Sequence, residues 1–208
     1  MNSNISLKLY NLIKMGVIKS NAQFWKSFYN EDYINTFPCD LQVIKQELKD
    51  KDINVICVFD ENFPSTNVKL KNSEKPFFFA YKGDITLLKD FDKNIAVIGV
   101  LTPTNEIVER ECKVVKSLTE KGFNIVSGLA KGCDTVAHSE SIKNNVKTIA
   151  FLPLTIEKIY PKENVELVNK IVENGGPIPP PIVSGSSSAR SIWWKGRFLL
   201  SSQPETVS

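Results

Sequence analysis

The sequence predicts an α/β protein in which a doubly wound, mainly parallel sheet follows a small helical N-terminal region. From residue 94 onward, short β-branched apolar runs alternate with longer segments whose apolar residues recur at helical spacing. Glycines follow these helical segments, as is common where a helix ends in a left-handed residue. Alternation of this kind requires parallel strands joined by right-handed helical crossovers. Residues 1–50, by contrast, carry helical spacing alone.

Composition and charge narrow the possible functions. The chain has 208 residues, of which 42% are hydrophobic and 24% charged, as in a soluble globular protein. The net charge is only +3, so any nucleic-acid binding must be local. No apolar run reaches the roughly 18 residues of a membrane span, and polar residues interrupt the N-terminus too often for a signal peptide. Because the four cysteines lack metal-ligand or disulfide spacing, we expect a reduced, cytoplasmic protein without a metal site.

The N-terminal part is expected to be helical and to lead into the main domain through two strands. The expected helices are 5–17, 21–29 and 41–48, and the expected strands are 53–59 and 76–81. Asp40 is suited to cap the third helix. Aromatic residues here are expected to lie in the core rather than to stack on bases. The resulting organisation is a helical region 1–50, a main domain 51–176 and a low-complexity segment 177–208.

The main domain is expected to bind its ligand where its strands end. The expected strands are 95–100, 123–126 and 146–152, and the expected helices are 104–121, a segment opening after Gly132, and 163–174. Thr104 is suited to cap the first helix and Gly122 to end it. Ligands of doubly wound sheets sit at the carboxyl ends of the strands. The loops in question are 99–104, 127–134 and 153–161.

The loop after strand 123–126 has the features of a phosphate site. Ser127-Gly128 ends the strand, and Gly132 opens a helix four residues later. A tight turn into a helix N-terminus points backbone N–H groups and the positive end of a helix dipole at one spot. Lys131 adds a cation and Ser127 a hydroxyl. The alternative is a strand–turn–helix with two conformational glycines and Asp134 as a helix cap.

Asp134 and His138 are expected on one face of that helix, since they lie four residues apart. In one interpretation they form a polar pair at the mouth of a pocket, with Asp134 fixing the imidazole or the loop N–H groups. In the other, Asp134 caps the helix and His138 is a hydrogen-bonded histidine at a helix–sheet junction.

Common catalytic and nucleotide-binding motifs are missing. The chain has no Gly-x-Gly-x-x-Gly after residue 99, no Gly-x-x-x-x-Gly-Lys-Ser/Thr and no Gly-x-Ser-x-Gly. The chain has a single histidine, too few for most histidine-containing metal clusters, and most catalytic triads would have to use that one residue. These absences favour binding over catalysis, with no enzymatic activity and no cofactor.

The stretch 125–138 resembles the signature of the DNA-processing protein A (DprA/Smf) family, Ser-Gly-x-Ala-x-Gly-x-Asp-x-x-Ala-His. The fixed positions are filled by Ser127, Gly128, Ala130, Gly132, Asp134, Ala137 and His138. Lys131 stands where the family commonly has Arg or Lys. Further matches follow in the family's order at 62–64, 81–83, 147–150 and 160–164. The resemblance covers roughly residues 41–176.

The resemblance implies a Rossmann-like, dimeric protein that binds single-stranded DNA and hands it to a RecA-type recombinase during natural transformation. Such proteins have no catalytic activity of their own. The binding residues it implies are Gly99, Thr104, Ser127, Gly128, Ala130, Lys131, Gly132, Asp134 and His138, with Lys195 and Arg197 further on. A turn of amide donors beside Lys131 would hold backbone phosphates without reading bases.

Two departures from the family pattern bear on this expectation. The family's first loop carries an arginine where this chain has Leu101, so DNA binding is expected to be weaker. The segment 193–201 matches the family's basic segment poorly, so its tryptophans either stack on bases or lie in the core. The chain stops at Ser208, where the family continues, as expected of either a fragment or a short form.

A rival interpretation is a nucleotide-ligand sensor or nucleotide-processing protein of the same superfamily. The phosphoribohydrolases of that superfamily resemble one another in a Pro-Gly-Gly-x-Gly-Thr-x-x-Glu loop, which this chain lacks. The sensor interpretation remains, and the missing arginine favours it. A third possibility is a fold that persists without a ligand.

Overall fold

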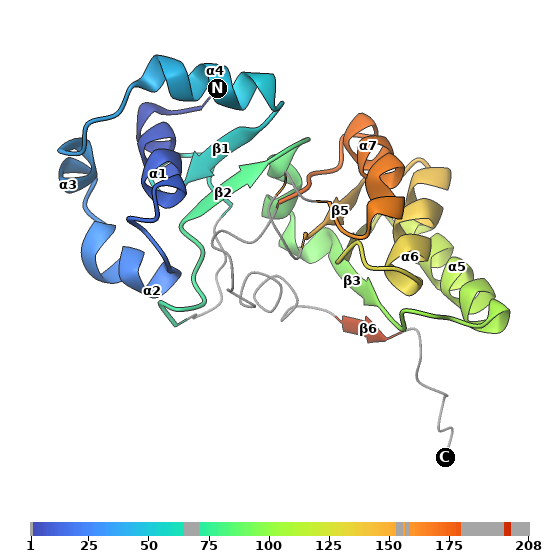
Figure 1. Cartoon of the computed structure of the whole chain (residues 1–208). Helices are drawn as coiled ribbons and strands as arrows, with labels where there is room; N and C mark the ends of the chain where they lie inside the picture. The colour runs from blue at the N-terminus through green and yellow to red at the C-terminus, as the bar shows by residue number, and fades with distance from the viewer. Residues whose placement is uncertain (1, 65–70, 153–155, 157–158, 180–197, 201–208) are drawn as a thin grey trace.

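A computed structural model describes residues 2–64, 71–152, 156, 159–179 and 198–200 of the chain. Its elements form two lobes (Figure 1): the N-terminal helices gather around an antiparallel hairpin, and three later helices lie beside a second sheet. None of the described helices is both long and apolar enough to span a membrane.

Local capping signals define the N-terminal helices. They are α1 (Asn4–Lys14), α2 (Asn21–Gln23), which continues into the π-helical turn η1 (Phe24–Phe28), α3 (Glu31–Asn35) and α4 (Leu41–Asp50). Asp40 caps α4 as predicted, because its carboxylate accepts hydrogen bonds from the backbone N–H groups of Gln42 and Val43. The sequence analysis missed α3, whose cap is the Asn30 side chain. Its five residues are too few to show a helical period.

The predicted pair of early strands forms a separate antiparallel sheet. β1 (Asn54–Cys57) pairs with β2 (Phe78–Tyr81), and both contact α1. Phe24 and Phe77 stack beneath them with ring centroids 3.9 Å apart, and both rings are fully buried. The expectation that aromatic residues here belong to the core is confirmed for these two rings, whereas Tyr29 is 60% exposed.

The second sheet has the predicted parallel topology. It contains β3 (Asn94–Ile98), β4 (Asn124–Ser127), β5 (Thr148–Ala150) and β6 (Phe198–Leu200), in the order β5-β4-β3-β6. All three pairings are parallel. The helices are α5 (Asn105–Glu120), α6 (Cys133–Lys143) and α7 (Val165–Glu173), and 3₁₀ turns occupy η2 (Ile85–Lys89), η3 (Phe91–Lys93) and η4 (Lys162–Asn164). The predicted α/β class is confirmed.

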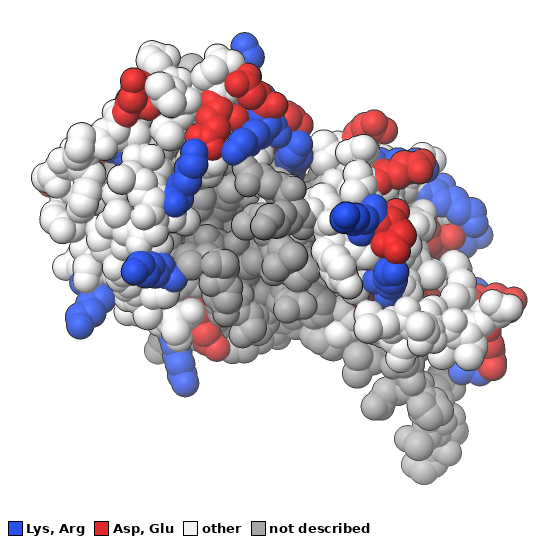
Figure 2. Space-filling model, in the orientation of Figure 1, with Lys and Arg blue, Asp and Glu red and all other residues white. Residues whose placement is uncertain are grey.

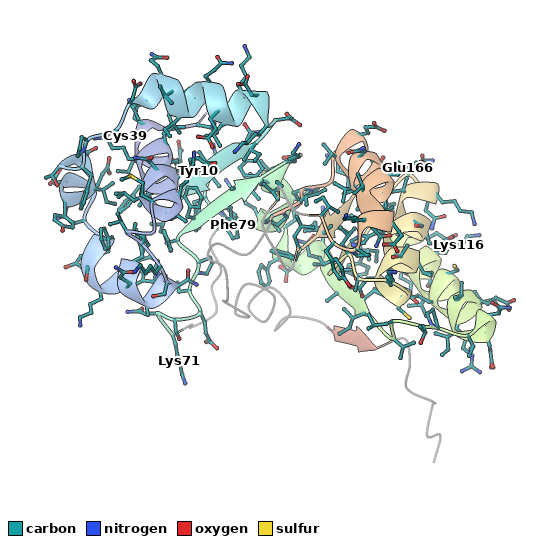
Figure 3. All side chains as sticks on the ribbon, in the orientation of Figure 1. Tyr10, Cys39, Lys71, Phe79, Lys116 and Glu166 are labelled. Carbon is teal, nitrogen blue, oxygen red and sulfur yellow. The ribbon has the colours of Figure 1, made fainter. Side chains whose placement is uncertain are left out.

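The buried face of α5 differs from the apolar stripe that helical spacing predicts. The apolar residues at that spacing are Ile107, Val108, Cys112, Val115 and Leu118, whereas the buried positions of the helix are Glu111, Val115 and Thr119. The other four residues of the stripe, namely Ile107, Val108, Cys112 and Leu118, are half-buried. Polar or charged side chains project outward from the same layer, as Lys116 of α5 and Glu166 of α7 illustrate (Figure 3).

Backbone contacts fix the hairpin against the second sheet. The N–H of Ile178 donates to the Lys82 carbonyl oxygen at 3.0 Å, just after β2 ends. Buried residues of α1, β1, β2, β4 and β5 belong to one hydrophobic cluster. A boundary at residue 50 therefore stays a prediction.

Candidate nucleic-acid interface

Three segments meet at the carboxyl ends of the parallel strands. The N–H of Cys133 donates to the Val100 carbonyl oxygen at 3.1 Å, which joins the loop after β3 to the start of α6. The Nδ2 of Asn164 donates to the Leu129 carbonyl oxygen at 2.9 Å, which joins the segment before α7 to the loop after β4. The structure thus brings together the predicted loops 99–104 and 127–134, at the edge expected for a ligand site. The third segment at this edge follows the predicted loop 153–161, of which residues 153–155 and 157–158 lie outside the described residues.

The Asp134 carboxylate organises the loop after β4. Its Oδ2 accepts hydrogen bonds from the backbone N–H groups of Gly128 and Ala130, each at 3.1 Å. The cap position of α6 is Gly132, and no side chain of the described residues caps this helix. Of the roles considered for Asp134, fixing the loop N–H groups is therefore the one observed. Those two N–H groups are already occupied, which differs from the expectation that they face a ligand.

Gly132 lets the loops approach closely. Its backbone has φ 78° and ψ −126°, a region that is essentially restricted to glycine. A Cβ at this position would run into the carbonyl oxygens of Val100 and Leu101. The glycine is thus required both by the turn and by the neighbouring loop.

Asn164 is a site residue that the sequence analysis did not single out. It is 6% exposed, and its Nδ2 lies within hydrogen-bonding distance of the carbonyl oxygens of Leu129 and Ala130 and of the Thr135 hydroxyl. Its place in the family-like segment 160–164 was the one signal for it. Asn164, the last residue of η4, thus ties the segment before α7 to the loop after β4 and to the first turn of α6.

Lys131 projects from the loop as an exposed cation. Its Nζ lies 2.7 Å from Oε1 of Glu163, and the two side chains are 57% and 66% exposed. The Glu163 carboxylate accepts a hydrogen bond from Lys131, which raises the pKa of the lysine and lowers that of the glutamate. Since water and salt screen an exposed pair, a phosphate oxygen can replace Glu163 as the partner of Lys131.

Ser127 and His138 lie beneath the site, with no exposed surface. The Ser127 hydroxyl donates to the Val97 carbonyl oxygen at 2.7 Å. The Nδ1 of His138 lies 2.7 Å from Oγ1 of Thr148, which itself donates to the Ile125 carbonyl oxygen. Thr148 therefore accepts from a protonated Nδ1, and burial lowers the pKa of His138 to about 3, so the imidazole is neutral. This is the arrangement of a hydrogen-bonded histidine at a helix–sheet junction.

The remaining candidates are placed less centrally. Gly99 is half-buried, and exposed Thr104 caps α5 by accepting from the N–H of Ile107 at 3.4 Å. Leu101, at the position of the family arginine, is 64% exposed. Lys195 and Arg197 lie outside the described residues.

The charges of the interface are local. Figure 2 shows basic and acidic side chains interleaved over the visible face rather than gathered in one basic field. Within the described part of the chain, no group of three or more histidine, cysteine or acidic side chains could hold a metal ion. The site can offer an anion the positive end of the α6 dipole and the Lys131 ammonium.

Comparison with known proteins identifies relatives. The family model described as DNA recombination-mediator protein A matches residues 54–188. Protein Smf of Borreliella burgdorferi is 32% identical over 183 residues, which cover 83% of this chain and 55% of that protein. DNA processing protein DprA of Streptococcus pneumoniae is 40% identical over 98 residues, covering 47% of this chain and 34% of that protein. The chain thus spans less than two thirds of either relative.

A solved structure shares the fold. The X-ray structure of DNA processing protein A from Streptococcus pneumoniae superposes with a TM-score of 0.63 and 22% identity. The match covers 92% of this chain and 72% of that one. At this level of identity the likeness supports the Rossmann-like fold alone.

Proposed function

The chain belongs to the DNA recombination-mediator protein A family, and from this membership we propose that it binds single-stranded DNA without sequence preference. In this proposal it is a non-enzymatic mediator of DNA recombination. The observation that carries the proposal is the convergence of the loops after β3 and β4 and the segment before α7 at the N-terminus of α6, beside exposed Lys131. These groups attract phosphate, which every nucleotide has, and they do not read base edges.

Each residue of the interface has its own role in this proposal. A phosphate of the DNA backbone binds in front of the first turn of α6, and one of its oxygens replaces the Glu163 carboxylate as the ion-pair partner of Lys131. Gly132 lets the loop after β3 pack against the start of α6, and Thr104 caps the start of α5. Gly99 is proposed to let the backbone of the loop after β3 come close to the phosphate. Asp134 and Asn164 hold the loop in shape, while Ser127 and His138 support it from below.

Partners and place of action follow from the family resemblance. We propose a homodimer in the cytoplasm that delivers single strands to a RecA-type recombinase during DNA uptake. Lys195 and Arg197 are proposed to extend the contact to the DNA backbone.

Fluorescence anisotropy with labelled single strands, duplexes and free nucleotides tests this function. We expect single strands of different sequence to bind with similar affinity, and a mononucleotide to compete poorly. Tight binding of a mononucleotide, with indifference to oligonucleotides, would instead support a nucleotide sensor.

A further inference from the structure

Glu111 is a buried carboxylate between α5 and α6. Its side chain has no exposed surface, and the one donor near its carboxylate among the described residues is the thiol of Cys133, which is a weak donor. Glutamate is rarely fully buried unless it is paired, since burial without a partner strongly disfavours the charged form. The position is therefore costly for a residue with a purely structural role.

The titratable groups that face Glu111 belong to the start of α6. They are the thiol of Cys133, which is buried, and the carboxylate of Asp134, which holds the loop N–H groups. α5 packs on α6 and β4, and neither β4 nor the adjacent β3 has a titratable side chain. The loop 99–104 has none either, and the neighbours of Glu111 one turn away on α5 are apolar. Among the described residues, the groups that act on the charge of Glu111 are this thiol and this carboxylate, and neither is a cation.

The charge of Glu111 changes close to neutral pH. Burial raises the pKa of Glu111, the Cys133 thiol lowers it in part, and the charge of Asp134 raises it further, to about 7. His138, the one histidine of the chain, has its pKa lowered to about 3 by burial and stays neutral in this range. The charge of Glu111 thus changes near neutral pH, and it interacts electrostatically with Asp134, the residue that holds the loop N–H groups.

We propose that Glu111 is a proton switch for the phosphate-binding loop at the N-terminus of α6. With the carboxyl neutral, the loop and the helix dipole accept a phosphate oxygen. With the carboxyl ionised, a second negative charge beside Asp134 opposes the incoming anion, and the buried surroundings screen it little. Since such coupling is reciprocal, binding of a phosphate favours uptake of a proton by Glu111. This inference rests on the proposed binding of single-stranded DNA at the loop.

The test is the affinity for a labelled oligothymidylate at about pH 6 and about pH 8, at constant ionic strength. We expect the unaltered chain to bind about fivefold more weakly at the higher pH, the low end of typical coupling between sites. Glu111→Gln, which mimics the neutral carboxyl, should bind equally well at both pH values. Glu109→Gln, an exposed position on the same helix, is the matched control and should keep the pH dependence.

The outcomes separate this inference from the function on which it rests. Absence of binding at both pH values would overturn the proposed function and the switch together. Binding that does not change with pH, or that changes equally in Glu111→Gln, would overturn the switch alone. Thermal unfolding of each variant at both pH values establishes that the compared chains are folded. Glu111→Asp keeps a carboxyl group at this position, so its affinity for the oligothymidylate should again depend on pH.

Discussion

The side chain of Asn164 donates a hydrogen bond to the carbonyl oxygen of Leu129, 35 residues away, at 2.9 Å. This contact holds the loop after β4 against the segment that leads into α7. Leu129 is buried and has φ 61°, an uncommon backbone conformation for a residue with a side chain. The proposed phosphate-binding loop is thus held by a long-range contact in addition to its own glycines.

Asn164→Ala should destabilise the fold by about 1–3 kcal/mol, because it leaves buried carbonyl oxygens without their donor. The loosened loop should also bind single-stranded DNA more weakly. Chemical denaturation and anisotropy measure the two effects. Asn169→Ala, at an exposed position of α7, is the control and should change stability by less than about 0.5 kcal/mol. Equal stability of the two variants would contradict the role given to Asn164.

Gly132→Ala and Gly122→Ala should differ although both residues have a positive φ, 78° and 80°. A Cβ on Gly122 has no neighbouring atom within 4 Å, whereas one on Gly132 meets the carbonyl oxygens of the loop after β3. We expect a loss of about 1–2 kcal/mol for Gly122→Ala from backbone strain alone. For Gly132→Ala we expect roughly 3 kcal/mol or more. Similar unfolding midpoints would mean that the two loops do not pack as described.

Glu111→Gln should stabilise the protein at alkaline pH. The pKa of Glu111 in the fold, about 7, lies above its ordinary value of 4.5, so the folded state binds the proton more tightly than the unfolded state does. The wild-type chain therefore loses stability as pH rises above 4.5, until the loss is complete above 7. At about pH 8 the variant should be more stable by on the order of 1–3 kcal/mol, and near pH 4 the two should be equal. A difference that is independent of pH would show that the carboxyl does not titrate in this way.

Leu101→Arg should strengthen binding of single-stranded DNA. The leucine is 64% exposed, and its carbonyl oxygen lies beside the position that a Cβ on Gly132 would take. A guanidinium group at this position can form a bidentate pair with a phosphate, which predicts a gain of about tenfold to a hundredfold in affinity for single-stranded DNA. Leu101→Lys adds the positive charge without the bidentate geometry of arginine, so its gain in affinity should be smaller. No gain from either change would place the DNA away from this loop.

Local signals predicted much of the fold, because they lie within a few residues of what they determine. Asp40 and Thr104 cap the helices that follow them, and Gly122 ends α5. The parallel sheet followed from the alternation of strands and helices. The short helix α3 was missed, because five residues carry too little periodicity.

The details of the site depend on contacts that the sequence does not display. Helical spacing placed Glu111 outside the apolar stripe of α5, yet packing against α6 buries it. From the sequence, Asp134 could either cap α6 or accept hydrogen bonds from the N–H groups of the preceding loop. The backbone path of the loop determines that it accepts from Gly128 and Ala130. The partners of Asn164 are about 30 residues away, beyond the reach of any local pattern.

The salt dependence of single-strand binding by Lys131→Glu tests the central claim most directly. Lys45→Glu is the matched control, since it makes the same charge change at an exposed position of α4, in the other lobe (Figure 1). If Lys131 holds a backbone phosphate, Lys131→Glu should weaken binding alike for all sequences and reduce the slope of log affinity against log salt by about 1, while Lys45→Glu leaves it unchanged. An unchanged slope and affinity in Lys131→Glu would contradict the placement of the DNA at the N-terminus of α6.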